Sequence, residues 1–163
     1  LFEQGKVFLP GLLSSATAAQ QAFEIIKEKL ASSNEESISK GKIILATVKG
    51  DIHDIGKNIV KVLLENYGYD VIDLGRDVEP SLVVETAVKE NVKLVGLSAL
   101  MTTTLKSMED TIALIRKTPE LKDTAVLVGG AVLTEEYAKK IDADYYCKTA
   151  AISVETANKF FGN

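Results

Sequence analysis

His53 is the only histidine in this chain of 163 residues, and its neighbours could equip it for chemistry. It lies two residues after Asp51, directly before Asp54 and three residues before Gly56. An imidazole can bind a metal through one nitrogen while a carboxylate orients it through the other. The same spacing also permits a structural role, in which His53 is a loop residue and Asp51 or Asp54 caps the following helix.

The metals that His53 could bind are restricted by the scarcity of other ligands. A zinc site made by this chain alone would need further histidine or cysteine residues, and a His-Asp phosphohydrolase would need a second histidine. The one cysteine, Cys147, is distant in sequence and is interpreted as a structural thiol. A single histidine can still bind a metal whose other positions are filled by a macrocycle, such as haem or a corrinoid.

The segment around His53 also has the glycines of a phosphate-binding loop, at Gly50 and Gly56-Lys57. Five residues separate these glycines where that motif has four, and Asn58 stands where a serine or threonine would bind magnesium. A nucleotidase is therefore not favoured.

Two further segments could contribute to the same site. Ser98 and the run Thr102–Thr104 place four hydroxyl groups within seven residues, where they could cap a helix or bond a ligand that carries nitrogen and oxygen. Gly129 and Gly130 could form a simple turn, or could let a flat ligand group approach bare backbone.

Alternating apolar and amphipathic segments predict the elements that position these residues. Strands are expected at 43–48, 70–74, 94–98, 125–128 and 143–147, with helices at 55–67, 80–91, 104–117, 134–141 and 152–161. This alternation indicates an α/β fold, flavodoxin-like (Rossmann-like), with a five-stranded parallel sheet in the order 2-1-3-4-5. That order brings His53, the hydroxyl run and the two glycines to one edge of the sheet.

The N-terminal part of the chain has a different pattern. Apolar residues from Leu12 to Leu30 recur at spacings of three and four, which predicts an amphipathic helix, and the serine-rich stretch 31–40 predicts a linker. The chain does not begin with methionine, so we expect that sequence upstream of Leu1 is missing.

Composition excludes several classes of function. A hydrophobic content of 46 % and a charged content of 26 % are typical of a globular protein. The net charge of −4 and the lack of a basic tract argue against nucleic-acid binding, and no apolar run approaches the ~20 residues of a membrane span. A single cysteine fits the reducing cytoplasm, which is the expected location.

Together the three segments resemble the cobalamin-binding domain family. The matching positions are Asp51-x-His53-x-x-Gly56, then 41 residues, Ser98-x-Leu100, then 28 residues, and Gly129-Gly130. The resemblance implies a helical cap before the domain, which here corresponds to residues 1–38 with the linker, and a cobalamin-binding α/β domain at 39–163. Within the family, the chain is most similar to methyltransferase corrinoid proteins and to the matching domain of methionine synthase.

The resemblance assigns roles to individual residues. His53 would be the lower axial ligand of cobalt, Asp51 would accept a hydrogen bond from its other nitrogen, and Thr104 would stand where the family usually has serine. Phe8 would shield the methyl side of the corrinoid. The remaining cofactor-binding residues that it implies are Asp54, Ile55, Gly56, Ser98, Leu100, Thr102, Gly129 and Gly130, with Ser98 and Thr102 along the nucleotide tail and both glycines at its base.

The function implied is that of a methyl carrier with a methylcobalamin-type corrinoid (cobamide) as cofactor. One methyltransferase would deliver a methyl group to cobalt, and a second would pass it to a thiol or tetrahydrofolate; a reductive activator is a further expected partner. The alternative is the cobalamin-binding subunit or domain of an adenosylcobalamin-dependent mutase. A cobalamin-dependent photosensor or regulator would need a DNA-binding region, and no part of this chain is basic enough for one. A cofactor-free flavodoxin-like interaction domain is the remaining alternative.

Overall fold

The computed structural model describes residues 39–162 without a gap, together with Lys6, Phe8 and scattered residues between 10 and 25. The described residues from 10 to 25 are helical, as the periodicity predicts. The apolar positions on which that prediction rests, and the expected linker as far as residue 38, lie outside the described residues.

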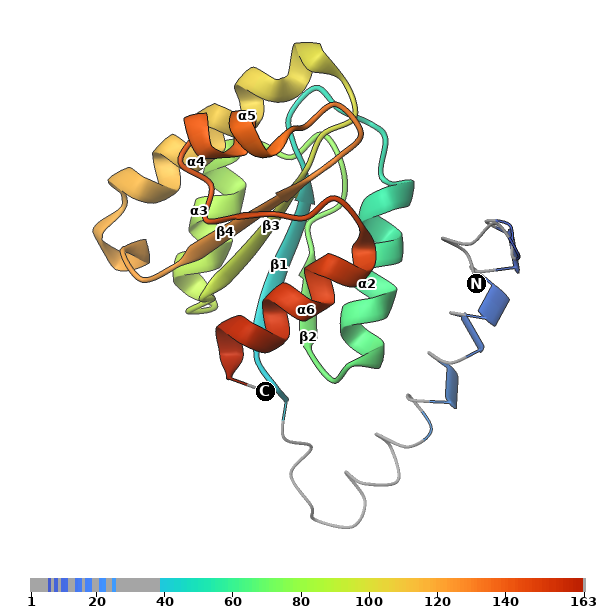
Figure 1. Ribbon diagram of the computed structural model, residues 1–163. Helices are drawn as coiled ribbons and strands as arrows, with labels where there is room; N and C mark the ends of the chain where they lie inside the picture. Colours follow the sequence, from blue (N-terminus) through green and yellow to red (C-terminus); the bar gives the residue numbers. More distant parts are fainter. Residues whose placement is uncertain are drawn as a thin grey trace.

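Five parallel strands form one sheet in the order β2-β1-β3-β4-β5, which confirms the predicted topology (Figure 1). The strands are β1 (Lys42–Thr47), β2 (Asp70–Asp73), β3 (Leu94–Ser98), β4 (Ala125–Gly129) and β5 (Tyr145–Tyr146). The central strands are continuous apolar runs because both of their faces are buried. The edge strand β5 is shorter than predicted, since it pairs with β4 only at Leu127 and Val128.

Helices follow the strands in alternation, as the sequence predicts. They are α2 (Ile55–Asn66), α3 (Pro80–Lys89), α4 (Leu105–Lys117), α5 (Glu135–Lys140) and α6 (Ala150–Phe161), with short 3₁₀ turns η1 (Thr102–Thr104) and η2 (Pro119–Leu121). Helix α6 begins two residues earlier than predicted, because the Thr149 side chain caps it by accepting a bond from the Ile152 amide.

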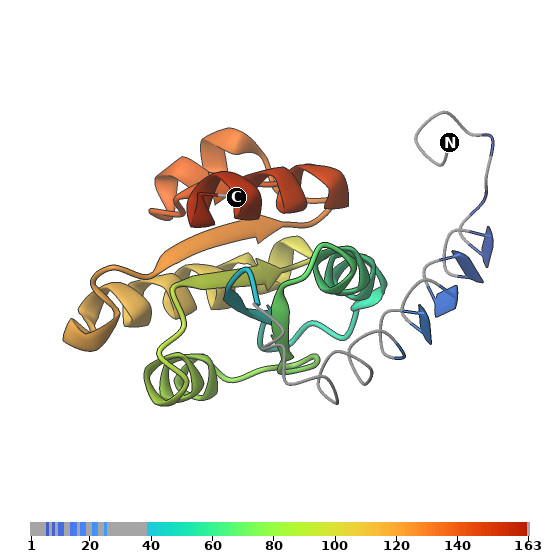
Figure 2. The same cartoon turned by 90° about the horizontal axis from the view of Figure 1, so that it is seen from below.

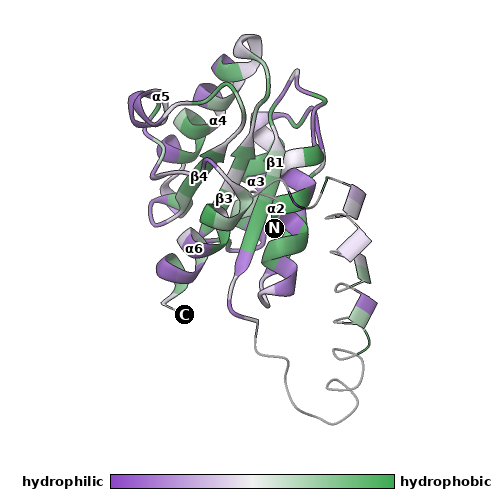
Figure 3. Ribbon diagram, turned by 45° about the vertical axis from the view of Figure 1, so that its right-hand side comes forward, coloured by the Kyte–Doolittle hydropathy of each residue, from purple (hydrophilic) through white to green (hydrophobic). Residues whose placement is uncertain are grey.

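Two hydrophobic cores hold the helices against the sheet. Ile43 and Leu45 of β1 pack with Leu64 of α2 and Val154 of α6, whereas Ile44 and its neighbours on the other face pack with α3 and α4. Figure 2 shows α6 and α4 on opposite sides of β4, and Figure 3 shows the hydrophobic colour gathered on the strands between the helices. The sheet is therefore the middle of three layers.

The strand register brings the three predicted segments to one edge of the sheet. Thr47 at the end of β1 pairs with Ser98 at the end of β3, and Ser98 pairs with Gly129 at the end of β4. The loops that follow these strands carry His53, Thr104 and Gly130. Within the described residues, no helix is long and apolar enough to cross a membrane.

Candidate functional site

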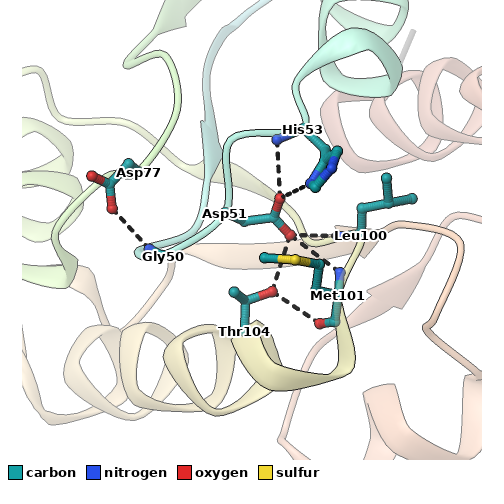
Figure 4. A network of polar contacts seen from close by, with 7 residues as sticks. All are labelled: Gly50, Asp51, His53, Asp77, Leu100, Met101 and Thr104. Carbon is teal, nitrogen blue, oxygen red and sulfur yellow. Dashed lines mark hydrogen bonds and ion pairs between the residues drawn. The ribbon is translucent and has the colours of Figure 1, made fainter.

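Asp51 is the centre of a polar network at the end of β1 (Figure 4). Its side chain is fully buried. Oδ1 accepts hydrogen bonds from the backbone amide of His53, at 3.0 Å, and from Nδ1 of the His53 ring, at 2.7 Å. One carboxylate oxygen therefore fixes both the backbone and the imidazole of the histidine.

The second oxygen of Asp51 reaches the loop after β3. Oδ2 accepts hydrogen bonds from the amide of Leu100 at 2.7 Å, the amide of Met101 at 3.3 Å and the hydroxyl of Thr104 at 3.0 Å. The Thr104 hydroxyl also lies 2.9 Å from the Met101 carbonyl oxygen, so these two acceptors share its one proton. Asp51 thus ties the histidine loop to the neighbouring strand.

These bonds keep Asp51 ionised. Burial alone would raise the pKa of its carboxyl group, but the amides of His53 and Leu100, the His53 ring and the Thr104 hydroxyl outweigh that effect. The pKa of Asp51 consequently lies well below its ordinary value of 3.8. A carboxylate that accepts several hydrogen bonds in a buried site is expected to behave in this way.

His53 presents its other ring nitrogen for binding. An ionised Asp51 can only accept, so the proton of the imidazole lies on Nδ1 and the lone pair on Nε2. The histidine side chain is 45 % exposed, and Nε2 has no hydrogen-bond partner in the part of the chain that the structure describes. That part also contains no cluster of three or more His, Cys, Asp or Glu residues suited to a metal. A metal on Nε2 would have to bring most of its ligands with it.

The helix-cap interpretation of the two aspartates is wrong. Asp54 is the residue before α2, but its side chain makes no capping hydrogen bond. Asp51 directs its carboxylate to His53 and to the loop after β3 instead. Asp51 therefore serves the histidine and not the helix.

A cavity of about 1210 Å³ opens beside this network, on the face of the sheet covered by α2 and α6. Leu45, Gly96 and Leu127 from three neighbouring strands line it. The predicted residues that line it are Gly56, Ser98, Leu100, Gly129 and Gly130. The volume is that of a site for a large organic ligand.

Glycines shape this cavity. Gly130 has φ +141°, and a Cβ there would overlap the carbonyl oxygen of Ala99. A Cβ on Gly129 would lie 3.1 Å from the carbonyl oxygen of Cys147. A Cβ on Gly56 would meet no atom within 4 Å, so it would stand in the space beside the cavity. The first two glycines allow close backbone packing, and the third leaves an opening for a ligand.

Four predicted cofactor-binding residues lie neither in the hydrogen-bond network of Asp51 nor in the lining of the cavity: Phe8, Asp54, Ile55 and Thr102. Ile55 is 59 % exposed at the start of α2, and Thr102 is exposed in η1 and is not among the cavity-lining residues. Phe8 is 79 % exposed, and its role over the corrinoid stays a prediction.

Cys147 is buried, and burial raises the pKa of its thiol, in keeping with a structural residue.

Sequence reasoning missed several contributors to the site. The amides of Leu100 and Met101 bond Asp51 through the backbone, which carries no side-chain signal. Gly96 could have been noticed, because a glycine inside a buried strand often marks a close approach. Its missing side chain leaves room for Leu45 and Leu127 below the cavity.

A free Nε2 on an anchored imidazole, beside a large cavity with an opening at Gly56, suits a metal held in a bulky organic ring. A family model described as the B12 binding domain matches residues 41–155. This chain belongs to the B12-binding domain family. Its cofactor is a cobalamin-type corrinoid, as predicted.

Relatives of this B12-binding domain include corrinoid proteins. Dimethylamine corrinoid protein 1 of Methanosarcina acetivorans is 41 % identical over 98 % of this chain and 74 % of its own length. A corrinoid protein of Desulfitobacterium hafniense is 40 % identical over 99 % of this chain and 75 % of its own length. These relatives do not favour the mutase alternative.

Solved structures agree with this assignment. A cobalamin-binding protein from Desulfitobacterium hafniense has a TM-score of 0.82 and 32 % identity, covering 98 % of this chain and 74 % of that one. The methanol:cobalamin methyltransferase complex MtaBC from Methanosarcina barkeri gives a TM-score of 0.83 and 31 % identity, covering 100 % of this chain and 61 % of that one. The flavodoxin-like fold of the B12-binding domain is thereby confirmed.

Proposed function

We propose that this protein is a methyl carrier. It would receive a methyl group on a bound corrinoid from one methyltransferase and yield it, through a second, to a thiol or tetrahydrofolate. The anchored His53 with its free Nε2 beside the cavity is the observation that carries the proposal. The names of the relatives support methylated amines as the class of donor.

The residues of this chain would hold the corrinoid and adjust it. When bound, the corrinoid supplies a cobalt centre that can take up and release a methyl group. His53 would bind the metal through Nε2, while Asp51 orients the ring and makes it a better donor. Thr104 and the amides of Leu100 and Met101 keep Asp51 ionised. The apolar residues that line the cavity would exclude water from a bound corrinoid.

The division of the chain forms part of the proposal. Residues 39–163 would be the corrinoid-binding domain, and residues 1–38 the end of a helical cap and its linker. Phe8 would cover the methyl side, and the cap would move to admit each partner. A reductive activator would restore cofactor that has become oxidised.

Reconstitution tests the proposal. The protein is loaded with methylcobalamin and compared with a His53→Ala variant by visible spectroscopy. Light then cleaves the cobalt–carbon bond into cobalt(II) and a methyl radical, and the cobalt(II) form is compared by electron spin resonance. We expect the wild type to show nitrogen coupling from one imidazole and the variant to bind corrinoid without it. Absence of bound corrinoid in the wild type would overturn the whole proposal, and unchanged coupling in the variant would overturn the assignment of His53.

Partner assays test the carrier role itself. The loaded protein is mixed with a dimethylamine-type methyltransferase and, separately, with methyltransferases that use a thiol or tetrahydrofolate. Methyl transfer on or off the cofactor should appear as a change in the visible spectrum. A loaded protein that exchanges no methyl group with any of these partners, yet binds corrinoid through His53, would contradict the carrier role alone.

A further inference from the structure

The segment 75–79 after β2 lies along the end of β1 and the loop that carries His53. The amide of Thr47 donates to the Gly75 carbonyl at 3.0 Å, and the amide of Val78 donates to the Thr47 carbonyl at 3.1 Å. Val48 and Val78 form a parallel bridge. The pairing of β1 with its neighbour therefore continues, after a break, up to the edge of the site.

Asp77, within this segment, contacts the histidine loop twice. Its Oδ1 accepts a hydrogen bond from the Gly50 amide at 2.8 Å (Figure 4). Its own amide donates to the Asp51 carbonyl at 3.0 Å. Asp51 is thus held through its side chain by the loop after β3 and through its backbone by Asp77.

The backbone of Asp77 is unusual. Its φ of +54° lies in the left-handed region, which aspartate tolerates better than most residues. Gly50, its bonding partner, has φ +83°. Conformations of this kind persist where the surrounding contacts determine them, and they concentrate at functional sites. The two hydrogen bonds of Asp77 with the histidine loop hold its backbone in this left-handed conformation.

Charge adds to these contacts. Nζ of Lys49 lies 3.3 Å from Oδ1 of Asp77 and 2.9 Å from Oε1 of Glu79. Asp77 accepts a hydrogen bond from the backbone of the loop that leads to His53, at Gly50. In the described part of the chain, the Glu79 side chain contacts only the Lys49 side chain of that loop and none of its backbone amides. Glu79 therefore offers a matched control, because it shares the cation but not the contact with Gly50.

We propose that Asp77 is a positioning residue for His53. It fixes Gly50 and the backbone of Asp51, and so sets the direction of the Asp51 carboxylate that orients the imidazole. The consequence for cobalt ligation rests on the proposed function, whereas the effect on the imidazole does not need the cofactor. The loops after β1, β2 and β3 would then hold the histidine jointly.

The first test uses the protein without cofactor. Because His53 is the only histidine, ¹⁵N magnetic resonance of the imidazole reports its tautomer without ambiguity. We expect Asp77→Ala to lower the ratio of the Nδ1–H form to the Nε2–H form by about fivefold, which corresponds to one lost hydrogen bond. Asp77→Asn, which keeps the oxygen that faces Gly50, should restore most of the ratio, and Glu79→Gln should leave it unchanged.

The second test uses protein loaded with cobalamin and reduced to cobalt(II). Asp77→Ala should lower the ratio of histidine-ligated to unligated cofactor by about fivefold. Asp77→Asn should restore most of this ratio, and Glu79→Gln should leave it unchanged. A wild-type protein that fails to bind corrinoid would contradict the proposed function only. A wild type with histidine coupling and an Asp77→Ala variant with the same spectra in both tests would overturn the role of Asp77.

Misfolding is separated by further variants. If Asp77→Ala does not fold, Asp77→Gly relieves the left-handed backbone and still removes the oxygen, so the same two ratios should fall. If Asp77→Gly folds and keeps both wild-type ratios, the proposal is wrong. The proposal would also be wrong if Glu79→Gln changed the two ratios as much as the Asp77 variants do. The effect would then come from the ion pair with Lys49, which both acidic residues share.

Discussion

Thr104 shows how a departure from the family pattern is accommodated at a single residue. Its hydroxyl bonds Asp51, as the serine of the pattern would. A Cβ placed on Gly50 would lie 3.4 Å from Cγ2 of Thr104, so the extra methyl group occupies the space beside that glycine. The hydroxyl of Thr104 therefore contributes a hydrogen bond, and its methyl group contributes packing beside Gly50.

Substitutions at Thr104 should separate these two parts. Thr104→Val removes the hydroxyl from a fully buried carboxylate, and we expect it to lower the free energy of unfolding by about 1–2 kcal/mol. Thr104→Ser keeps the hydroxyl and should cost less than about 1 kcal/mol. Urea unfolding of both variants measures the difference. A serine variant as unstable as the valine variant would contradict the assigned role of the hydroxyl.

An ion pair between Lys57 and Asp73 links the start of helix α2 to the end of strand β2. The Lys57 side chain is 2 % exposed, and Nζ bonds Asp73 Oδ1 and, at 2.9 Å, Asn58 Oδ1. A cation in the first turn of a helix is disfavoured by the helix dipole. The ion pair with Asp73 therefore compensates, and it lowers the pKa of the Asp73 carboxyl against the opposing effect of burial.

Breaking this pair should loosen the element that follows His53. Lys57→Met keeps the length of the side chain but leaves Asp73 with the Gly75 amide, at 2.9 Å, and the longer contact to the Lys61 cation, at 3.5 Å. We expect a loss of about 2 kcal/mol in the free energy of unfolding, below the 3–5 kcal/mol typical of fully buried pairs. The control Lys61→Met should cost less than about 1 kcal/mol. Equal stability of wild type and Lys57→Met would show that the pair contributes nothing.

Two glycines beside the cavity, Gly130 in the loop after β4 and Gly56 in the first turn of α2, give a second prediction. Gly130→Ala should destabilise the protein by about 2 kcal/mol or more, because the new methyl group overlaps Ala99 and φ is positive. Gly56→Ala should leave stability unchanged or raise it by about 0.5–1 kcal/mol, since its Cβ meets nothing. Corrinoid uptake by the Gly56 variant should nevertheless fall. Thermal unfolding and a cobalamin titration test both statements.

The whole molecule should respond to acid partly through Asp51. The pKa of this group is lower in the folded protein than its ordinary value of 3.8, so ionisation favours the folded state above that pH. The contribution, about 2 kcal/mol at pH 7, is lost as the pH falls from 3.8 towards the lower folded value.

Asp51→Asn isolates this contribution. We expect the variant to be less stable than wild type at pH 7, and the gap in the free energy of unfolding to shrink below pH 4. Urea unfolding between pH 7 and pH 2.5 measures the gap, and subtraction removes the titration of the other carboxylates. A gap that stays constant with pH would mean that Asp51 has an ordinary pKa in the folded protein.

The sequence alone determined the fold class, the strand order and the cofactor. Strands appear in the sequence as short apolar runs and helices as apolar residues that recur every three or four positions, and both patterns are local. Parallel strands joined by right-handed crossovers then allow few arrangements. Three short motifs at fixed spacings sufficed for the cobalamin resemblance, because the register of β1, β3 and β4 places their ends together.

The tertiary structure decided how the histidine is held. The partners of Asp51 include two backbone amides from another loop, and the contact of Asp77 joins residues 27 positions apart in sequence. Backbone groups are the same in every residue, so their use cannot be seen in the sequence. The burial of Lys57 and the volume of the cavity likewise depend on how α2 and α6 pack on the sheet, which no local pattern specifies.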